Sequence, residues 1–250
     1  GLKGDRQWMI VNEKGQMVTQ RKNPKLALIQ PRLYPDGRME LTHTNLPSLI
    51  VEPILPGSNA LTVYAWKDSV EANAANKNVS KWLRQALDTR QTLRLVQFNP
   101  NTIRTPGQPE RFGATARHFA DAAPYLICNA ESLRALNRHL RSREITPVSM
   151  TNFRGNIIID GLEAFSEHRF SVLATHRGKL LQLVDHCSRC IMITVDPLTG
   201  EKRTDSSPLM QLAELNSMPT QPKAPAFGIN ASLLSESETR IQCGDRLTLS

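Results

Sequence analysis

The chain has 250 residues, of which 40% are hydrophobic and 22% are charged, which is the composition of an ordinary folded protein with a sizeable core. No apolar run approaches the roughly 18–20 residues that cross a bilayer, so composition argues against a membrane-spanning protein. The formal net charge of +8 favours an anionic partner. Aromatic residues make up only 5% and do not interleave with the basic groups, which disfavours nucleic acid as that partner.

The first hundred residues carry mostly strand patterns. In chain order, β-rich or apolar runs occupy residues 7–12, 16–20, 26–33, 39–42, 61–66 and 93–98, with turn residues between them. One helix interrupts the series at 80–87, because Trp82, Leu83 and Ala86 recur at helical spacing. Residues 101–117, rich in Gly, Pro and charge, form a loop between two halves.

The second half combines short strands with two helices. Asn129 is a predicted N-cap for a helix over 131–140, and a further helix is expected over 208–215. Residues 170–175 and 179–184 predict a hairpin around Arg177-Gly178, residues 191–195 a β-branched strand, and residues 218–226 a Pro-rich loop. The expected fold class is therefore mainly β with peripheral helices (α+β), with domains over 1–100 and 101–250.

Four cysteines, at positions 128, 187, 190 and 243, are too few for a disulfide framework. Their uneven spacing predicts a reducing compartment, and we expect the protein to be cytoplasmic.

The pair Cys187–Cys190 admits several interpretations. Structural zinc needs a second ligand pair, which is missing although His186 adjoins the first. A thioredoxin-like dithiol needs a helix after the motif, whereas the residues that follow predict a strand. A thiolate ligand for a transition metal or a metal cofactor remains, and the charge of Arg189 favours a thiolate. Two buried core cysteines would have the same spacing.

Three polar residues stand near strand boundaries. Arg6 precedes the first strand, Arg154 precedes the strand at 156–160, and Asp121 lies in a turn-like stretch before a proline. A planar guanidinium suits bidentate contact with a phosphate or a heterocycle edge, but arginines at strand ends are often merely solvated. By itself, Asp121 reads as a turn residue.

Taken together, these motifs resemble those of the MOSC proteins, named for the molybdenum cofactor sulfurase C-terminal domain. The branch that they resemble most is that of the mitochondrial amidoxime-reducing component and of bacterial relatives that detoxify N-hydroxylated bases. Residues 1–8 and 15–21 are similar to an N-terminal β-barrel domain, and residues 119–133, 152–156 and 187–200 to the MOSC β-barrel. The last block, Cys-Ser-Arg-Cys followed by Thr-Val-Asp-Pro-x-Thr-Gly, is the most specific.

The resemblance implies a site and an activity. Cys190 matches the molybdenum ligand, Arg6, Arg154 and Asn156 match positions that line the cofactor, and Asp121 matches an acidic residue near the metal. The implied cofactor is the molybdenum cofactor (molybdopterin), and the implied reaction is reduction of small N-hydroxylated compounds such as hydroxylamino-purines and amidoximes. The resemblance also implies pyridoxal phosphate binding. The implied protein is a monomer that receives electrons from a separate donor, a ferredoxin-like protein or a flavin reductase.

The chain departs from the family pattern at four places. The family opens with a strand carrying Tyr-Pro-x-Lys-Ser, and this chain starts after it. Gly155 replaces a proline, which we expect to loosen the backbone, and Ile229 stands where glutamine is usual. The plant-type ferredoxin motif that some bacterial relatives append is not found, which is why a separate electron donor is expected. A non-catalytic cofactor or sulfur carrier, or a basic interaction module without cofactor, are the alternative functions.

Overall fold

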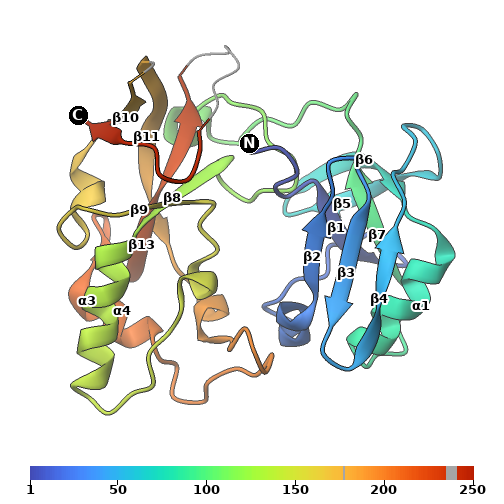
Figure 1. Cartoon of the computed structure of the whole chain (residues 1–250), viewed down its shortest axis with the longest axis horizontal. Helices are drawn as coiled ribbons and strands as arrows, with labels where there is room; N and C mark the ends of the chain where they lie inside the picture. Colours follow the sequence, from blue (N-terminus) through green and yellow to red (C-terminus); the bar gives the residue numbers. More distant parts are fainter. Residues whose placement is uncertain (177, 235–240) are drawn as a thin grey trace. The chain divides into compact units, whose positions relative to one another are not determined.

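The computed structural model describes residues 1–176, 178–234 and 241–250, which form two compact units (Figure 1). The first, called the N-terminal unit here, comprises residues 3–104 and 195–203. The second, the C-terminal unit, comprises residues 1–2, 105–194 and 204–250. The N-terminal unit has two sheets and the C-terminal unit has one, and each unit has its own apolar core. The domain boundary predicted between residues 100 and 101 stays a prediction.

The N-terminal unit contains two antiparallel sheets (Figure 1). A four-stranded sheet has the order β1-β7-β6-β5, and a three-stranded sheet the order β2-β3-β4. The strands are β1 (Trp8–Asn12), β2 (Gln30–Leu33), β3 (Met39–His43), β4 (Leu46–Val51), β5 (Ala60–Ala65), β6 (Asp68–Ala74) and β7 (Leu93–Phe98), with a short 3-10 helix η1 at Pro24–Leu28. Alternation along β1 buries Met9 and Val11, as expected of a strand with one face on a core.

Helix α1 (Lys77–Ala86) packs against β7 and β4 and closes this core. Its buried residues, Val79, Trp82, Leu83 and Ala86, recur at three- and four-residue spacing and so form one apolar face. The Asn76 side chain caps the helix by accepting a hydrogen bond from the Asn78 amide.

The C-terminal unit is built around one curled sheet with the order β14-β10-β11-β13-β8-β9, to which β12 adds by pairing with β13. All pairings are antiparallel except that of β8 with β9. The strands are β8 (Tyr125–Asn129), β9 (Ile157–Ile159), β10 (Val172–Thr175), β11 (Gly178–Ser188), β12 (Ser217–Met218), β13 (Gln221–Leu233) and β14 (Leu247–Leu249). Short 3-10 helices lie at Met150–Phe153 (η2), Ser166–Arg169 (η3) and Ile191–Thr194 (η4), and a four-residue helix α2 at Pro109–Phe112.

Two helices cover part of this sheet. Helix α3 (Ala130–Arg141) follows β8 directly, and the Asn129 side chain caps it by accepting a hydrogen bond from the Glu131 amide at 3.0 Å. Helix α4 (Leu209–Leu215) packs against both α3 and β13. The fully buried side chains of Leu136, Leu140 and Leu212 join Phe153 and Phe227 in a core beneath the two helices.

The predicted class, mainly β with peripheral helices, is confirmed. Three local predictions were wrong. Residues 16–20 contribute only the isolated bridges Val11–Met17 and Gln16–Tyr64. Residues 191–194 form η4 rather than a strand, and most of the supposed loop at 218–226 belongs to β12 and β13. At the turn predicted around Arg177-Gly178, Arg177 lies outside the described residues.

Candidate functional site

The two cysteines of the Cys-Ser-Arg-Cys segment occupy the end of β11 and the short link to η4. The Arg189 amide donates to the Pro225 carbonyl of β13 at 2.8 Å, and the Ile193 amide donates to the Cys190 carbonyl at 3.1 Å. Backbone bonds therefore fix both sides of Cys190. Neither cysteine forms a disulfide and both are half-buried, so Cys190 combines a held backbone with partial exposure.

Arg189 connects this segment to a second one. Its Nη1 donates to Cys187 Sγ at 2.9 Å, and its Nη2 donates to the Phe153 carbonyl at 2.7 Å. The guanidinium also lies over the Phe153 ring, 5.7 Å from its centroid, within the range of a cation–π contact. The positive charge that the sequence placed between the cysteines thus contacts Cys187.

The second segment is η2, which Arg154 terminates. Ser149 and Asn152 form a reciprocal cap at its start, and Asn152 Nδ2 donates to the Ile193 carbonyl of η4 at 3.0 Å. Arg154 has a left-handed backbone with φ of 57° and an exposed side chain. The structure therefore brings the Cys190 segment and the Arg154 segment together through Arg189 and Asn152.

Asn156 has a structural task. Its Oδ1 accepts from the Leu126 amide at 2.8 Å, and its Nδ2 donates to the Pro124 carbonyl at 3.1 Å. Its own amide donates to the Leu126 carbonyl. These bonds hold the start of β9 beside β8 and occupy both polar atoms of the side chain.

The two remaining predicted site residues lie elsewhere in the chain. Asp121 is exposed and lies four residues before β8, in the C-terminal unit. Arg6 belongs to the N-terminal unit, has φ of 51° and forms an ion pair with its neighbour Asp5.

The block Val195–Arg203, which follows η4, is assigned to the N-terminal unit. Asp196 organises it as a turn, because its Oδ1 accepts from the Leu198 amide at 2.7 Å and the Gly200 amide donates to its carbonyl. Gly200 has φ of 68°, and a Cβ there would lie 3.1 Å from Leu28 Cγ. The glycine of the most specific sequence block is thus required by backbone and by space.

A pair of histidines, one of which directly precedes Cys187, was missed by sequence reasoning. The rings of His168, on η3, and His186, on β11, lie 4.0 Å apart between centroids. His168 Nε2 contacts the Gly228 carbonyl at 3.1 Å, and Asn216 Nδ2 contacts His168 Nδ1 at 3.3 Å. Burial lowers the pKa of both histidines, and the neighbouring His168 lowers that of His186 further.

Next to His168, the carboxyl group of Glu167 is fully buried. It accepts hydrogen bonds from Asn129 Nδ2 and Ser132 Oγ, both at 3.1 Å. Burial raises its pKa, and these hydrogen bonds partly oppose that rise. Glu167 and His168 share η3, whereas His186 lies on β11, 18 residues later, so no local sequence signal reveals the cluster.

Among the described residues, no three His, Cys, Asp or Glu side chains gather as a set that could hold a metal ion. The half-buried Cys190, on a segment linked to that of the exposed Arg154, suits a metal that arrives with further ligands of its own on an anionic cofactor. The donor set of this site therefore fits a metal cofactor that needs one protein sulfur.

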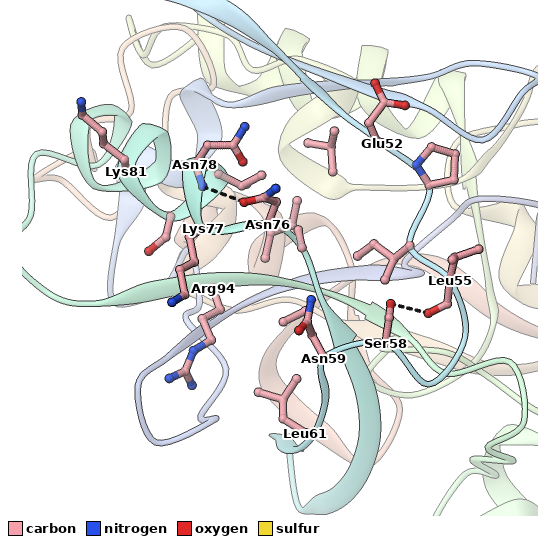
Figure 2. Close-up of a pocket in the computed structure, with 18 of the residues that line it drawn as sticks. Glu52, Leu55, Ser58, Asn59, Leu61, Asn76, Lys77, Asn78, Lys81 and Arg94 are labelled. Carbon is pink, nitrogen blue, oxygen red and sulfur yellow. Dashed lines mark hydrogen bonds between the residues drawn. The ribbon is translucent and has the colours of Figure 1, made fainter.

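The N-terminal unit contains an open pocket of about 1100 Å³ between the β4–β5 connection and α1 (Figure 2). Lys77, Lys81 and Arg94 lie on its rim together with Asn76, and Glu52 stands on the opposite side. No predicted site residue lines this pocket. Its position gives no support to a role in the chemistry of the cysteine segment.

In the part of the chain that the structure describes, every helix is too short or too polar to cross a membrane.

Comparison with known proteins gives two family matches. The model of the MOSC domain matches residues 114–248, and that of the MOSC N-terminal beta barrel domain matches residues 1–90. Mitochondrial amidoxime-reducing component 1 of Homo sapiens is 32% identical over 205 residues, which is 78% of this chain and 57% of that protein. The Mus musculus counterpart is 28% identical over 98% of this chain and 72% of its own length. Molybdenum cofactor sulfurase of Drosophila grimshawi is 30% identical over 100% of this chain and 31% of that protein.

Proposed function

Because this chain belongs to the MOSC-domain family, we propose that it binds the molybdenum cofactor through the Cys190 thiolate and reduces small N-hydroxylated compounds. The observation that supports this most is the placement of Cys190, a half-buried cysteine whose backbone is fixed on both sides by hydrogen bonds. Relatives named amidoxime-reducing components agree with such a reaction. The chain spans 57% of the human relative's length, so the activity of that whole protein is a proposal for this chain.

The residues divide the binding work between two segments. Cys190 supplies the sulfur ligand, and the exposed guanidinium of Arg154 suits a phosphate or a heterocycle edge of the cofactor. Arg6 stays a proposed cofactor contact that rests on the resemblance alone. Asn156 contributes indirectly, by holding β9 beside β8. Pyridoxal phosphate binding stays a prediction from the resemblance.

The reaction consumes two electrons and two protons per N–O bond broken, so that R–NH–OH becomes R–NH2 and one water is released. When bound, the cofactor supplies the redox centre that delivers the electron pair. Asp121 is proposed to relay a proton to the leaving oxygen, since an exposed carboxyl exchanges protons with solvent readily. Electrons come from a separate donor, a ferredoxin-like protein or a flavin reductase, and the charge of +8 suits an acidic one.

The test is turnover of benzamidoxime and of a hydroxylamino-purine by protein made in a cofactor-producing host, with a chemical electron donor. We expect amidine and amine products in stoichiometric amounts, and we expect Asp121→Asn to lower kcat and displace its pH profile. An Asp121→Asn variant with the full rate and an unchanged profile would remove Asp121 from the mechanism. Metal-loaded protein that turns over neither substrate contradicts the reductase function.

A second function is favoured by the sulfurase relatives, one of which aligns with the whole of this chain. In this alternative, the chain holds the cofactor or carries sulfur on Cys190 without catalysis of its own. Both functions need molybdenum-cofactor binding, and turnover separates them. Cytoplasmic location and a monomeric state are further parts of the proposal, which fractionation and light scattering will check.

A further inference from the structure

Arg189 is the chain neighbour of one proposed cofactor residue, Cys190, and contacts the chain neighbour of another, Arg154. It precedes Cys190 in the chain, and its Nη2 donates to the carbonyl of Phe153, the residue before Arg154. Its Nη1 donates to Cys187 Sγ, three residues before Cys190. One side chain thus joins the segment that carries the sulfur ligand to the segment that carries the guanidinium.

The point to which Arg189 attaches is rigid. Phe153 is fully buried, and its ring stacks on Phe227 of β13 with centroids 3.8 Å apart and an interplanar angle of 21°. The hydrogen bond from Asn152 to the Ile193 carbonyl ties η2 to the residues after Cys190. Cys190 is therefore bracketed by two links to the same turn, one from Arg189 before it and one at Ile193 after it.

We propose that Arg189 is a positioning residue whose planar fork keeps Cys190 and Arg154 in a fixed relative arrangement, so that one cofactor meets both. This inference rests on the proposed function. Only arginine supplies two divergent N–H donors and a flat face for the Phe153 ring at once. Lysine keeps the charge but presents a single point of donation, and it is expected to hold one of the two partners at a time.

The link that Arg189 makes between residues 149–156 and residues 187–195 is called the clamp here. It is tested on the cofactor-free full-length chain by hydrogen–deuterium exchange. In Arg189→Met, amides of both 149–156 and 187–195 should exchange roughly tenfold faster, since a charge-assisted link between them is lost. Arg189→Lys should accelerate amide exchange in both segments to a lesser degree. The matched control is Arg138→Met, which removes an exposed arginine paired with Glu131 on α3 and should leave both segments unchanged. Acceleration of only one segment, or of neither, overturns the clamp.

Cys187→Ala keeps the Phe153 contact and provides a milder variant in case Arg189→Met folds poorly. Faster exchange at 187–195 with unchanged exchange at 149–156 is expected of it. Equal acceleration of both segments would contradict the proposed division of the two bonds.

The positioning role of Arg189 is then tested in protein that contains the molybdenum cofactor. Loss of a residue that orients a ligand typically lowers metal affinity by 10–100-fold, so molybdenum retained through dialysis should fall by about that factor in Arg189→Met. The Mo(V) electron paramagnetic resonance signal of the remaining metal should broaden, which a general loss of stability would not produce. Unchanged retention and an unchanged signal overturn the role. A wild-type chain without molybdenum would sink the proposed function, while the exchange experiment still decides the clamp.

Discussion

Gly155 lies against the thiol of Cys128: a Cβ added at Gly155 would come within 2.6 Å of the Cys128 sulfur and 3.2 Å of its Cβ. Because Cys128 is buried on β8, only a residue without a side chain fits at position 155. This position lies between Arg154 and Asn156 of the proposed site. The expectation that this glycine merely loosens the backbone is thus incomplete, because it also makes room.

Gly155→Ala should destabilise the C-terminal unit by about 1–3 kcal/mol, the usual cost of overpacking a core. Adding Cys128→Ala should recover part of that loss, since the clashing sulfur is removed. Gly107→Ala is the control, because a Cβ there meets nothing within 4 Å. Urea titration followed by far-UV circular dichroism is the measurement, since all three tryptophans, Trp8, Trp66 and Trp82, lie in the N-terminal unit. Additive effects of the two substitutions would refute the contact.

Acid should weaken the C-terminal unit through His168. The Gly228 carbonyl can only accept, so His168 Nε2 carries its proton, and Nδ1 accepts from Asn216. Asn216 Nδ2 also donates to the Ala226 carbonyl at 2.9 Å, so a second proton on His168 would face an N–H donor. Burial lowers the pKa of His168 in the folded state, and the unfolded chain therefore binds more protons. The stability that His168 contributes is full above its ordinary pKa of about 6.5 and is lost as the pH falls below it.

Other groups around His168 titrate as well. The pKa of His186 is also lowered, which gives the same sign, whereas the raised pKa of Glu167 gives the opposite sign above its ordinary range. Comparing wild type with His168→Gln removes His168 together with its lowering effect on the pKa of His186, while Glu167 and Asp185 are common to both proteins. The urea midpoint should fall less between pH 7.5 and 5.5 in the variant. Parallel pH curves for the two proteins would show that His168 is not responsible.

Asn156 should matter before any cofactor binds. Asn156→Ala leaves the Leu126 amide and the Pro124 carbonyl without this partner, and each lost bond of this kind costs about 1–3 kcal/mol. The cofactor-free and loaded proteins should lose similar stability. Asn156→Asp keeps the acceptor for the Leu126 amide and should lose less than the alanine variant. If only the loaded protein is weakened, Asn156 contacts the cofactor instead.

Regular elements with a strong local pattern could be predicted from the sequence. The strand at Leu93–Phe98 and the helix capped by Asn129 appear where they were expected, because alternation and capping are local signals. The strand predicted at 191–195 was wrong for a long-range reason. Its β-branched residues favour a strand, but the Ile193 carbonyl accepts from Asn152, 41 residues away, and the chain turns into η4.

In the candidate site too, features with a local sequence pattern could be predicted, and contacts between distant positions could not. Its cysteines were identified by their spacing and by the residues around them. The link from Arg189 to Phe153 and the pairing of His168 with His186 join positions 36 and 18 residues apart, on elements whose neighbours only the folded sheet determines. The Pro-rich stretch that forms β13 was missed because prolines usually disrupt strands, although Pro225 faces Ser217 of the two-residue strand β12.

Molybdenum content is the measurement that tests the central claim most directly. Wild type, Cys190→Ser and Cys243→Ser are purified from the same cofactor-producing host and analysed for metal per chain. Cys243 is an exposed free cysteine in the C-terminal unit and serves as the matched control. The account predicts stoichiometric molybdenum in wild type and in Cys243→Ser, and its loss in Cys190→Ser. Wild type without molybdenum, or Cys190→Ser that retains it in full, would contradict the account.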